Sequence, residues 1–260
     1  MLTKLLKYDF KSLSKVLLPV YGISLLLALL TRIANVLADK FSVFSVPSGF
    51  ISAIFVIILI AVPIVTFIFT ILKFYQNLVK DEGYLMHTIP VSKHSLILSK
   101  TISSTIYLVI SGIMIFVLLF VGVYGLWFDS KFVHTFVEAI GHIDTIFLIL
   151  LLLSIFIGVV FNQIMVYASI ALGQKHNSKV LYSIIYGIVI YNATQIISAI
   201  LLLPFMLMDS NYQQYVDGSN VLDFGLINGF IALSLVISVL FIVAYYFLAV
   251  KTFDRKLNLE

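Results

Sequence analysis

Residues 41–72, FSVFSVPSGFISAIFVIILIAVPIVTFIFTIL, contain no charged side chain and are dominated by branched and aromatic residues. A helix needs about 20 largely apolar residues to cross the roughly 30 Å hydrocarbon core of a bilayer. This stretch is long enough, and it therefore predicts a membrane-spanning helix.

The same scarcity of charge extends along the whole chain of 260 residues, which is 62% hydrophobic and 11% charged with a mean hydropathy of +1.13. A soluble domain carries about 25% charged residues. Five further intervals between charges qualify as spans: 16–31, 101–128, 145–174, 180–208 and 224–250. The first is short, but Arg32 can extend its charged end to the membrane interface. We predict an all-α integral membrane protein whose single domain, residues 1–260, has six transmembrane helices between residues 16 and 250.

The basic residues decide the orientation. Thirteen of the 16 Lys and Arg residues fall on one side of the predicted membrane, in residues 1–15, 73–100, 175–179 and the tail 251–260. The other side has Arg32, Lys40 and Lys131. Since Lys and Arg are retained on the cytoplasmic side, both termini are predicted to be cytoplasmic.

The first fifteen residues have the pattern of an amphipathic helix. Leu2, Leu5, Leu6, Phe10 and Leu13 follow one face, and the lysines follow another, at Lys4, Lys7, Lys11 and Lys15. Such a helix lies in the headgroup layer, where each Lys contributes about 1 kcal/mol with anionic lipid. A cleaved signal peptide, with Ala34 and Ala38 before the cut, is the alternative. The length of the basic start and the presence of Asp9 favour retention.

Composition also excludes several classes of chemistry. Without Cys the chain has no thiolate nucleophile, no Cys-ligated zinc, no iron-sulfur cluster and no disulfide. The phosphate-binding pattern G-x-x-x-x-G-K-[ST] does not occur. Among the five histidines only His134, with Glu138, has the spacing of a helical metal pair, and we predict no metal site. The excess of basic residues serves topology, so no nucleic-acid partner is predicted.

Spans two to six contain no acidic or basic residue, which argues against a proton-driven carrier acting alone. Their polar residues are neutral: Thr66, Thr70, Asn162, Gln163, Tyr167, Tyr191, Asn192, Thr194 and Gln195. Interhelical hydrogen bonds are the commonest role of such groups.

The connection 73–100, KFYQNLVKDEGYLMHTIPVSKHSLILSK, is longer than a turn. An acidic pair precedes Gly83 and a short helical stretch, Pro90 breaks that stretch, and a new helix is predicted to begin after Ser92. Such a segment can dock on a soluble partner, and a solvated loop is the alternative.

Within this connection the run 81–100, DEGYLMHTIPVSKHSLILSK, resembles the link between the second and third spans of type-2 ABC exporter permeases. The matching residues are Gly83, Leu85, Met86, Thr88, Pro90, Val91, Ser92 and Lys100. The resemblance implies that residues 1–15 are the elbow helix and that residues 80–90 contain a coupling helix seated on an ATPase. Its ATPase-coupling residues would be Lys80, Asp81, Glu82, Gly83, Tyr84, Leu85, Met86, His87, Thr88 and Pro90. In that family spans two and five line the pathway, which selects Thr66, Thr70, Tyr191 and Gln195.

The resemblance implies a non-catalytic membrane subunit that requires ATP and magnesium on a separate ABC ATPase chain. Six spans form half a pathway, so a homodimer or a sister permease is expected. Such permeases export hydrophobic or amphipathic peptides, including antimicrobial and toxin peptides, across the plasma membrane of Gram-positive bacteria. Drug or ion efflux is the alternative within the class. A self-sufficient carrier or channel and a non-transporting membrane scaffold are the alternatives outside it.

The predicted orientation can be measured with single cysteines, because the native chain has none. A cysteine at Ser130 or Ser219 is expected to react with an impermeant thiol reagent added to intact cells, and one at Ser178 is not. Labelling at Ser178 alone would reverse the orientation.

Overall fold

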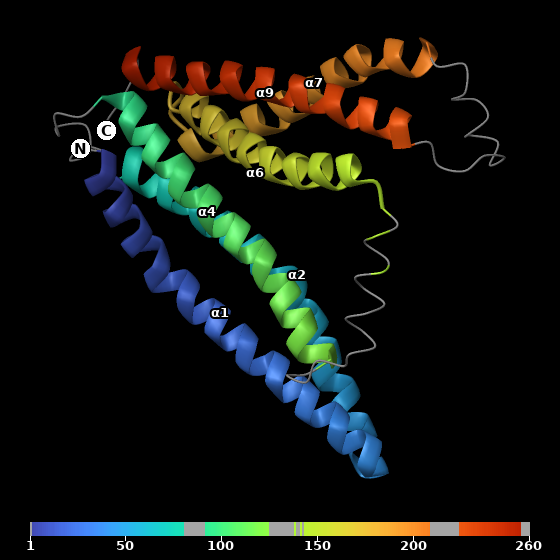
Figure 1. Ribbon diagram of the computed structural model, residues 1–260. Coiled ribbons are helices and arrows are strands. Elements are labelled where there is room, and N and C mark those ends of the chain that lie inside the picture. Colours follow the sequence, from blue (N-terminus) through green and yellow to red (C-terminus); the bar gives the residue numbers. More distant parts are fainter. Residues whose placement is uncertain are drawn as a thin grey trace. The chain divides into compact units, whose positions relative to one another are not determined.

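The computed structural model describes residues 2–80, 92–124, 138, 141, 143–208 and 224–255. This part of the chain is helical and contains no strand (Figure 1). Its elements are α1 (Leu2–Lys40), the 3-10 turn η1 (Ser42–Phe44), α2 (Ser45–Leu78), α4 (Lys93–Leu119), the π-helical turn η2 (Phe120–Tyr124), α6 (Thr145–Gly173), α7 (Lys179–Met208) and α9 (Phe224–Arg255).

Six helices in the described part of the chain are long and apolar enough to cross a membrane. They coincide with the six charge-free intervals. The prediction of an all-α protein with six helices able to cross a membrane is therefore confirmed. α1, α2, α4 and α9 extend beyond their intervals at one or both ends, because a helix does not need to end where the hydrocarbon ends, whereas α6 lies within its interval. α9, for example, includes the first five residues of the predicted tail.

The predicted N-terminal arm, residues 1–15, and the first span belong to one helix, α1. α1 has 39 residues, which corresponds to about 58 Å at a rise of 1.5 Å per residue, against a hydrocarbon core of about 30 Å. The predicted boundary between an elbow helix, residues 1–15, and a first span does not coincide with a break in α1. The placement of the arm in the headgroup layer stays a prediction.

Two helix starts are fixed by side-chain caps. The Ser92 hydroxyl accepts a hydrogen bond of 3.3 Å from the Ser95 amide, so α4 begins where the sequence predicted. The Asp144 carboxylate accepts one of 3.3 Å from the Ile146 amide at the start of α6. The negative charge of Asp144 also stabilises the positive end of the helix dipole.

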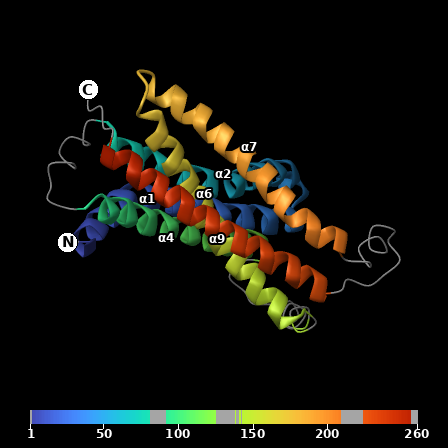
Figure 2. The ribbon, with the colours of Figure 1, turned by 90° about the horizontal axis from the view of Figure 1, so that it is seen from above.

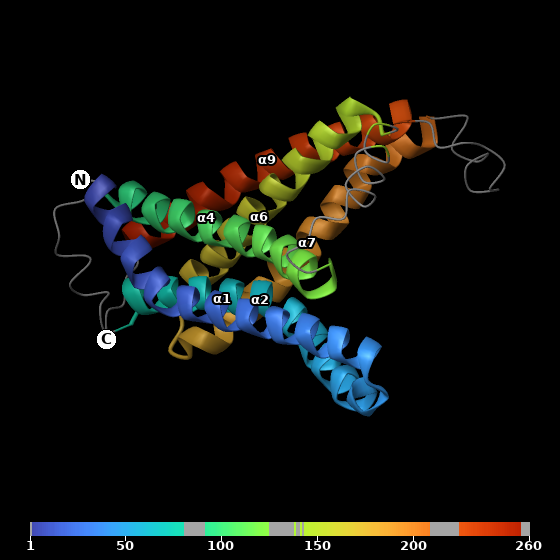
Figure 3. The same ribbon diagram turned by 60° about the horizontal axis from the view of Figure 1, so that its bottom comes forward.

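The chain divides into two compact units, and the first contains α1, α2 and α4. α1 and α2 form a helical hairpin closed by η1, with α4 packed against both (Figure 3). The buried residues of α1 recur every three or four positions, as one helix face requires. They are Asp9, Leu13, Leu17, Tyr21, Ser24, Ala28 and Thr31. The core that they build with α2 and α4 includes Phe55, Val62, Tyr107 and Leu118.

The second unit contains α6, α7 and α9. α6 and α7 are joined by a short turn (Figure 2), and this turn depends on Gly173. A Cβ at that position would lie 2.1 Å from the Ser183 hydroxyl and 2.7 Å from the Ser183 amide nitrogen. Thr194 of α7 is hydrogen-bonded to the hydroxyl of Tyr245 on α9. The Tyr245 ring lies 6.2 Å from the ring of Phe161 on α6, so one tyrosine connects all three helices.

Candidate functional site

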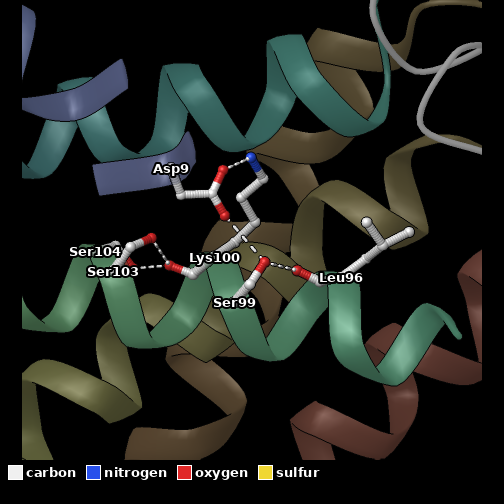
Figure 4. Close-up of polar contacts among 6 residues, drawn as sticks. All are labelled: Asp9, Leu96, Ser99, Lys100, Ser103 and Ser104. Carbon is white, nitrogen blue, oxygen red and sulfur yellow. Dashed lines mark hydrogen bonds and ion pairs between the residues drawn. The ribbon is translucent and has the colours of Figure 1, made fainter. Parts of the chain in front are cut away.

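An ion pair joins α1 to α4 within the first unit. The Lys100 ammonium donates to the Asp9 carboxylate, and each side chain is only 6% exposed. The Ser99 hydroxyl donates to the other oxygen of Asp9 over 2.9 Å (Figure 4). The carboxylate therefore has partners at both oxygens, which a buried charge requires.

The energetics of this pair are asymmetric. Removing two charges from water is costly, so a buried pair adds little net stability compared with apolar residues of the same volume. Removing one partner is different, because it leaves an uncompensated charge in the protein and typically costs about 3 to 5 kcal/mol. The pair therefore contributes more to the register between α1 and α4 than to the free energy of unfolding.

Small hydroxyl side chains surround the pair on α4. The Ser99 hydroxyl, which donates to Asp9, also lies 3.0 Å from the Leu96 carbonyl, and both Ser103 and Ser104 donate to the Lys100 carbonyl, at 3.1 Å and 2.6 Å (Figure 4). Since the Ser103 and Ser104 hydroxyls are satisfied by their own helix, they can be buried without a partner on α1. Their small volume allows another helix to approach closely.

Two further levels of contact tie α1 to α4. At the middle of α4, the Tyr107 hydroxyl donates to the carbonyl of Phe10, the residue after Asp9, at 3.2 Å, and the Tyr21 hydroxyl lies 3.3 Å from the Tyr107 carbonyl. At the far end, Arg32 donates to the Val123 carbonyl at 3.1 Å.

A cation at a helix C-terminus is favourable because the last carbonyls of a helix lack partners and carry partial negative charge. Arg32 therefore contacts the end of η2. Its charged end can also reach the membrane interface. The order of the three contacts shows that α1 and α4 run parallel.

Two of the predicted pathway residues lie inside the first unit. Thr66 is 0% exposed, and its hydroxyl lies 3.0 Å from the hydroxyl of Tyr21 and 2.8 Å from the Val62 carbonyl. Thr70 is 2% exposed and donates to the Phe67 carbonyl at 2.7 Å. These contacts are those of helix packing.

The other two pathway residues belong to the second unit. Tyr191 is 46% exposed, and Gln195, one turn later on α7, is also exposed. Thr194 between them points toward α9 and is buried. The four predicted residues therefore form two pairs with different surroundings, one packed within a unit and one on an open helix face.

Of the predicted ATPase-coupling residues, Lys80 is described and is exposed. The remainder, Asp81, Glu82, Gly83, Tyr84, Leu85, Met86, His87, Thr88 and Pro90, lie outside the described residues. The structure does fix both flanks of this segment, since α2 ends at Leu78 and α4 begins at Lys93.

The four lysines of the arm are exposed: Lys4, Lys7, Lys11 and Lys15. They lie on the face of α1 opposite Asp9, as 100° per residue dictates. Leu13 is buried in the core of the first unit and Phe10 packs against it. Part of the apolar face of the arm therefore contacts protein.

Sequence reasoning missed the ion pair. In the sequence, Lys100 stands out only as one of the predicted cytoplasmic lysines and as a residue of the permease-like run, and Asp9 only as evidence against a signal peptide. The signal was present in the pattern, because Asp9 is an acid on the apolar face of an amphipathic helix, four residues before Leu13. Such a residue needs a basic partner on a neighbouring helix.

Among the described residues no group of three or more His, Asp or Glu side chains is placed to hold a metal ion. Comparisons with protein-family models, with curated proteins and with solved structures find no match to this chain.

The role of Thr66 can be separated from that of a pathway residue. Thr66→Val keeps the shape but removes the hydrogen bond to Tyr21, and should lower the free energy of unfolding by about 0.5 to 1.5 kcal/mol. Thr70→Val is the matched control, because its hydroxyl bonds a carbonyl of its own helix and its loss should cost less. Unchanged stability with altered substrate flux in Thr66→Val would assign Thr66 to the pathway.

Proposed function

We propose that this chain is the membrane subunit of an ABC exporter, whose partner ATPase drives export of a hydrophobic or amphipathic peptide from a bacterial cell. The observation that carries the proposal is the sequence of the connection between the second and third apolar helices. Its run of Gly83, Thr88, Pro90 and Ser92 resembles the coupling segment of type-2 permeases and occurs at the corresponding place in a six-helix chain.

The helix ends on either side support this proposal. α2 and α4 are apolar helices that continue beyond their charge-free intervals, to Leu78 and from Lys93. They leave residues 79–92 between them, a short segment held at both ends by helices. A segment held in this way can transmit a displacement of a docked partner to two spans at once.

Two exposed polar side chains of α7 support assembly with a second membrane subunit. Tyr191 and Gln195 lie near the middle of an apolar helix, where polar side chains facing lipid are unfavourable. Their neighbour must be protein or water. A second copy of this chain, or a sister permease, can provide that neighbour together with an aqueous pathway.

The chemistry of these residues also limits the substrate. Phenol and amide groups can hydrogen-bond a peptide backbone but cannot neutralise a strongly charged ligand. This favours an uncharged or amphipathic peptide over an ion.

The chain has no phosphate-binding loop, so hydrolysis of magnesium-bound ATP is assigned to the partner and this subunit is not an enzyme.

The coupling proposal predicts the effect of truncating the apolar side chains between Gly83 and His87. A Tyr84→Ala, Leu85→Ala double variant should insert normally, yet lose the bound ATPase, because truncating buried anchors commonly costs about 2 kcal/mol or more. The measurement is a pull-down of the P-loop ATPase at matched amounts of membrane protein, followed by substrate-stimulated turnover.

Asn211→Ser, predicted to lie across the bilayer, is the control and should retain the ATPase. Full retention and full turnover by the double variant would reject the coupling segment and favour a self-sufficient carrier.

A further inference from the structure

The polar contacts between α1 and α4 differ in kind along α4. At the middle of α4 and beyond its C-terminal end, in η2, they are single hydrogen bonds to carbonyls, from Tyr107, Tyr21 and Arg32. At the beginning of α4 the contact is a buried ion pair, supported by the Ser99 hydroxyl. The strongest positional constraint on α4 is therefore at its N-terminal end.

That end leads directly to the connection with α2. Ser92, the cap of α4, lies eight residues before Lys100, about 12 Å along the helix. A helix segment this short is stiff, so the position of Lys100 sets the position of Ser92. α1 comes before this connection in the chain and α4 comes after it. The Asp9–Lys100 pair therefore joins helices from both sides of the connection.

We propose that the Asp9–Lys100 ion pair is a latch that makes the first turns of α1 and α4 move as one body and so sets the position of Ser92. The N-terminal arm is then a positioning element for the segment that enters α4. Asp9 and Lys100 are positioning residues and are not required to touch a substrate or a partner.

The consequence of the latch for transport rests on the proposed function. If an ATPase moves the connection, α4 and α1 follow together, and the displacement reaches Arg32 and Val123 at the other end of the helix pair. The latch itself rests on the contacts within the first unit alone. Its test therefore uses the isolated full-length chain.

The distance between the two helices can be measured directly. Because the native chain lacks Cys, nitroxide labels can be attached to cysteines at Lys11 on α1 and Leu98 on α4, both of which are exposed. Pulsed electron paramagnetic resonance of the full chain in lipid vesicles should give one narrow distance distribution.

Asp9→Asn should broaden the distribution and shift it to longer distances, because the amide cannot neutralise Lys100. The exchange Asp9→Lys with Lys100→Asp should narrow it again, because opposite charges are restored. Lys7→Gln, which removes an exposed charge from the same helix, is the matched control and should leave the distribution unchanged. A role in packing alone does not predict recovery by the charge exchange.

If Asp9→Asn fails to insert, the neutral pair Asp9→Asn with Lys100→Met leaves no uncompensated charge and should still broaden the distribution. A narrow, unshifted distribution in either the single variant or the neutral pair would overturn the latch.

Turnover of a bound ATPase separates the two proposals. Where an ATPase binds, Asp9→Asn should retain it and lose substrate stimulation. If no ATPase binds the native chain, the proposed function fails, and the distance measurement still decides the latch.

Discussion

A buried charge must meet an opposite charge, and this requirement organises the first unit. Asp9 lies on the apolar face of α1, where a carboxylate without a cationic partner is costly to bury. Lys100 provides that partner, at 6% exposure on each side. Once these two side chains face each other, the parallel course of α1 and α4 brings Tyr107 to Phe10 and Arg32 to Val123. The register of the two helices thus follows from one pair.

Much of the fold could be predicted from the sequence, because the property that defines it is local. An interval without charge, such as residues 41–72, indicates a span without knowledge of its neighbours, and Ser92 indicates a helix start by its own chemistry. The burial of Thr66 and the exposure of Tyr191 could not be predicted in this way. Both are neutral polar residues in apolar helices, and only the packing partner distinguishes them. The Asp9–Lys100 pair is separated by 91 residues, and its prediction required pairing one unusual acid with one of sixteen basic residues.

The proposed function accounts for these contacts together. An exporter subunit must connect a soluble ATPase to helices that cross the membrane, and the segment proposed to bind the ATPase lies between α2 and α4. α2 is bound to α1 through Thr66 and Tyr21, and α4 through Asp9. The long N-terminal helix is therefore bonded to both of the spans that flank the proposed coupling segment. Exposed lysines along its opposite face leave that face free to meet anionic headgroups.

The central claim is that Asp9 and Lys100 are energetically coupled, and a double-mutant cycle on the free energy of unfolding in mixed micelles measures this coupling. The cycle compares Asp9→Asn, Lys100→Met and the two together. Each single substitution is expected to cost about 3 to 5 kcal/mol, and the double variant clearly less than their sum, with a coupling energy of about 1.5 kcal/mol or more. Additive costs, within about 0.5 kcal/mol, would show that the two residues do not depend on each other and would contradict the account.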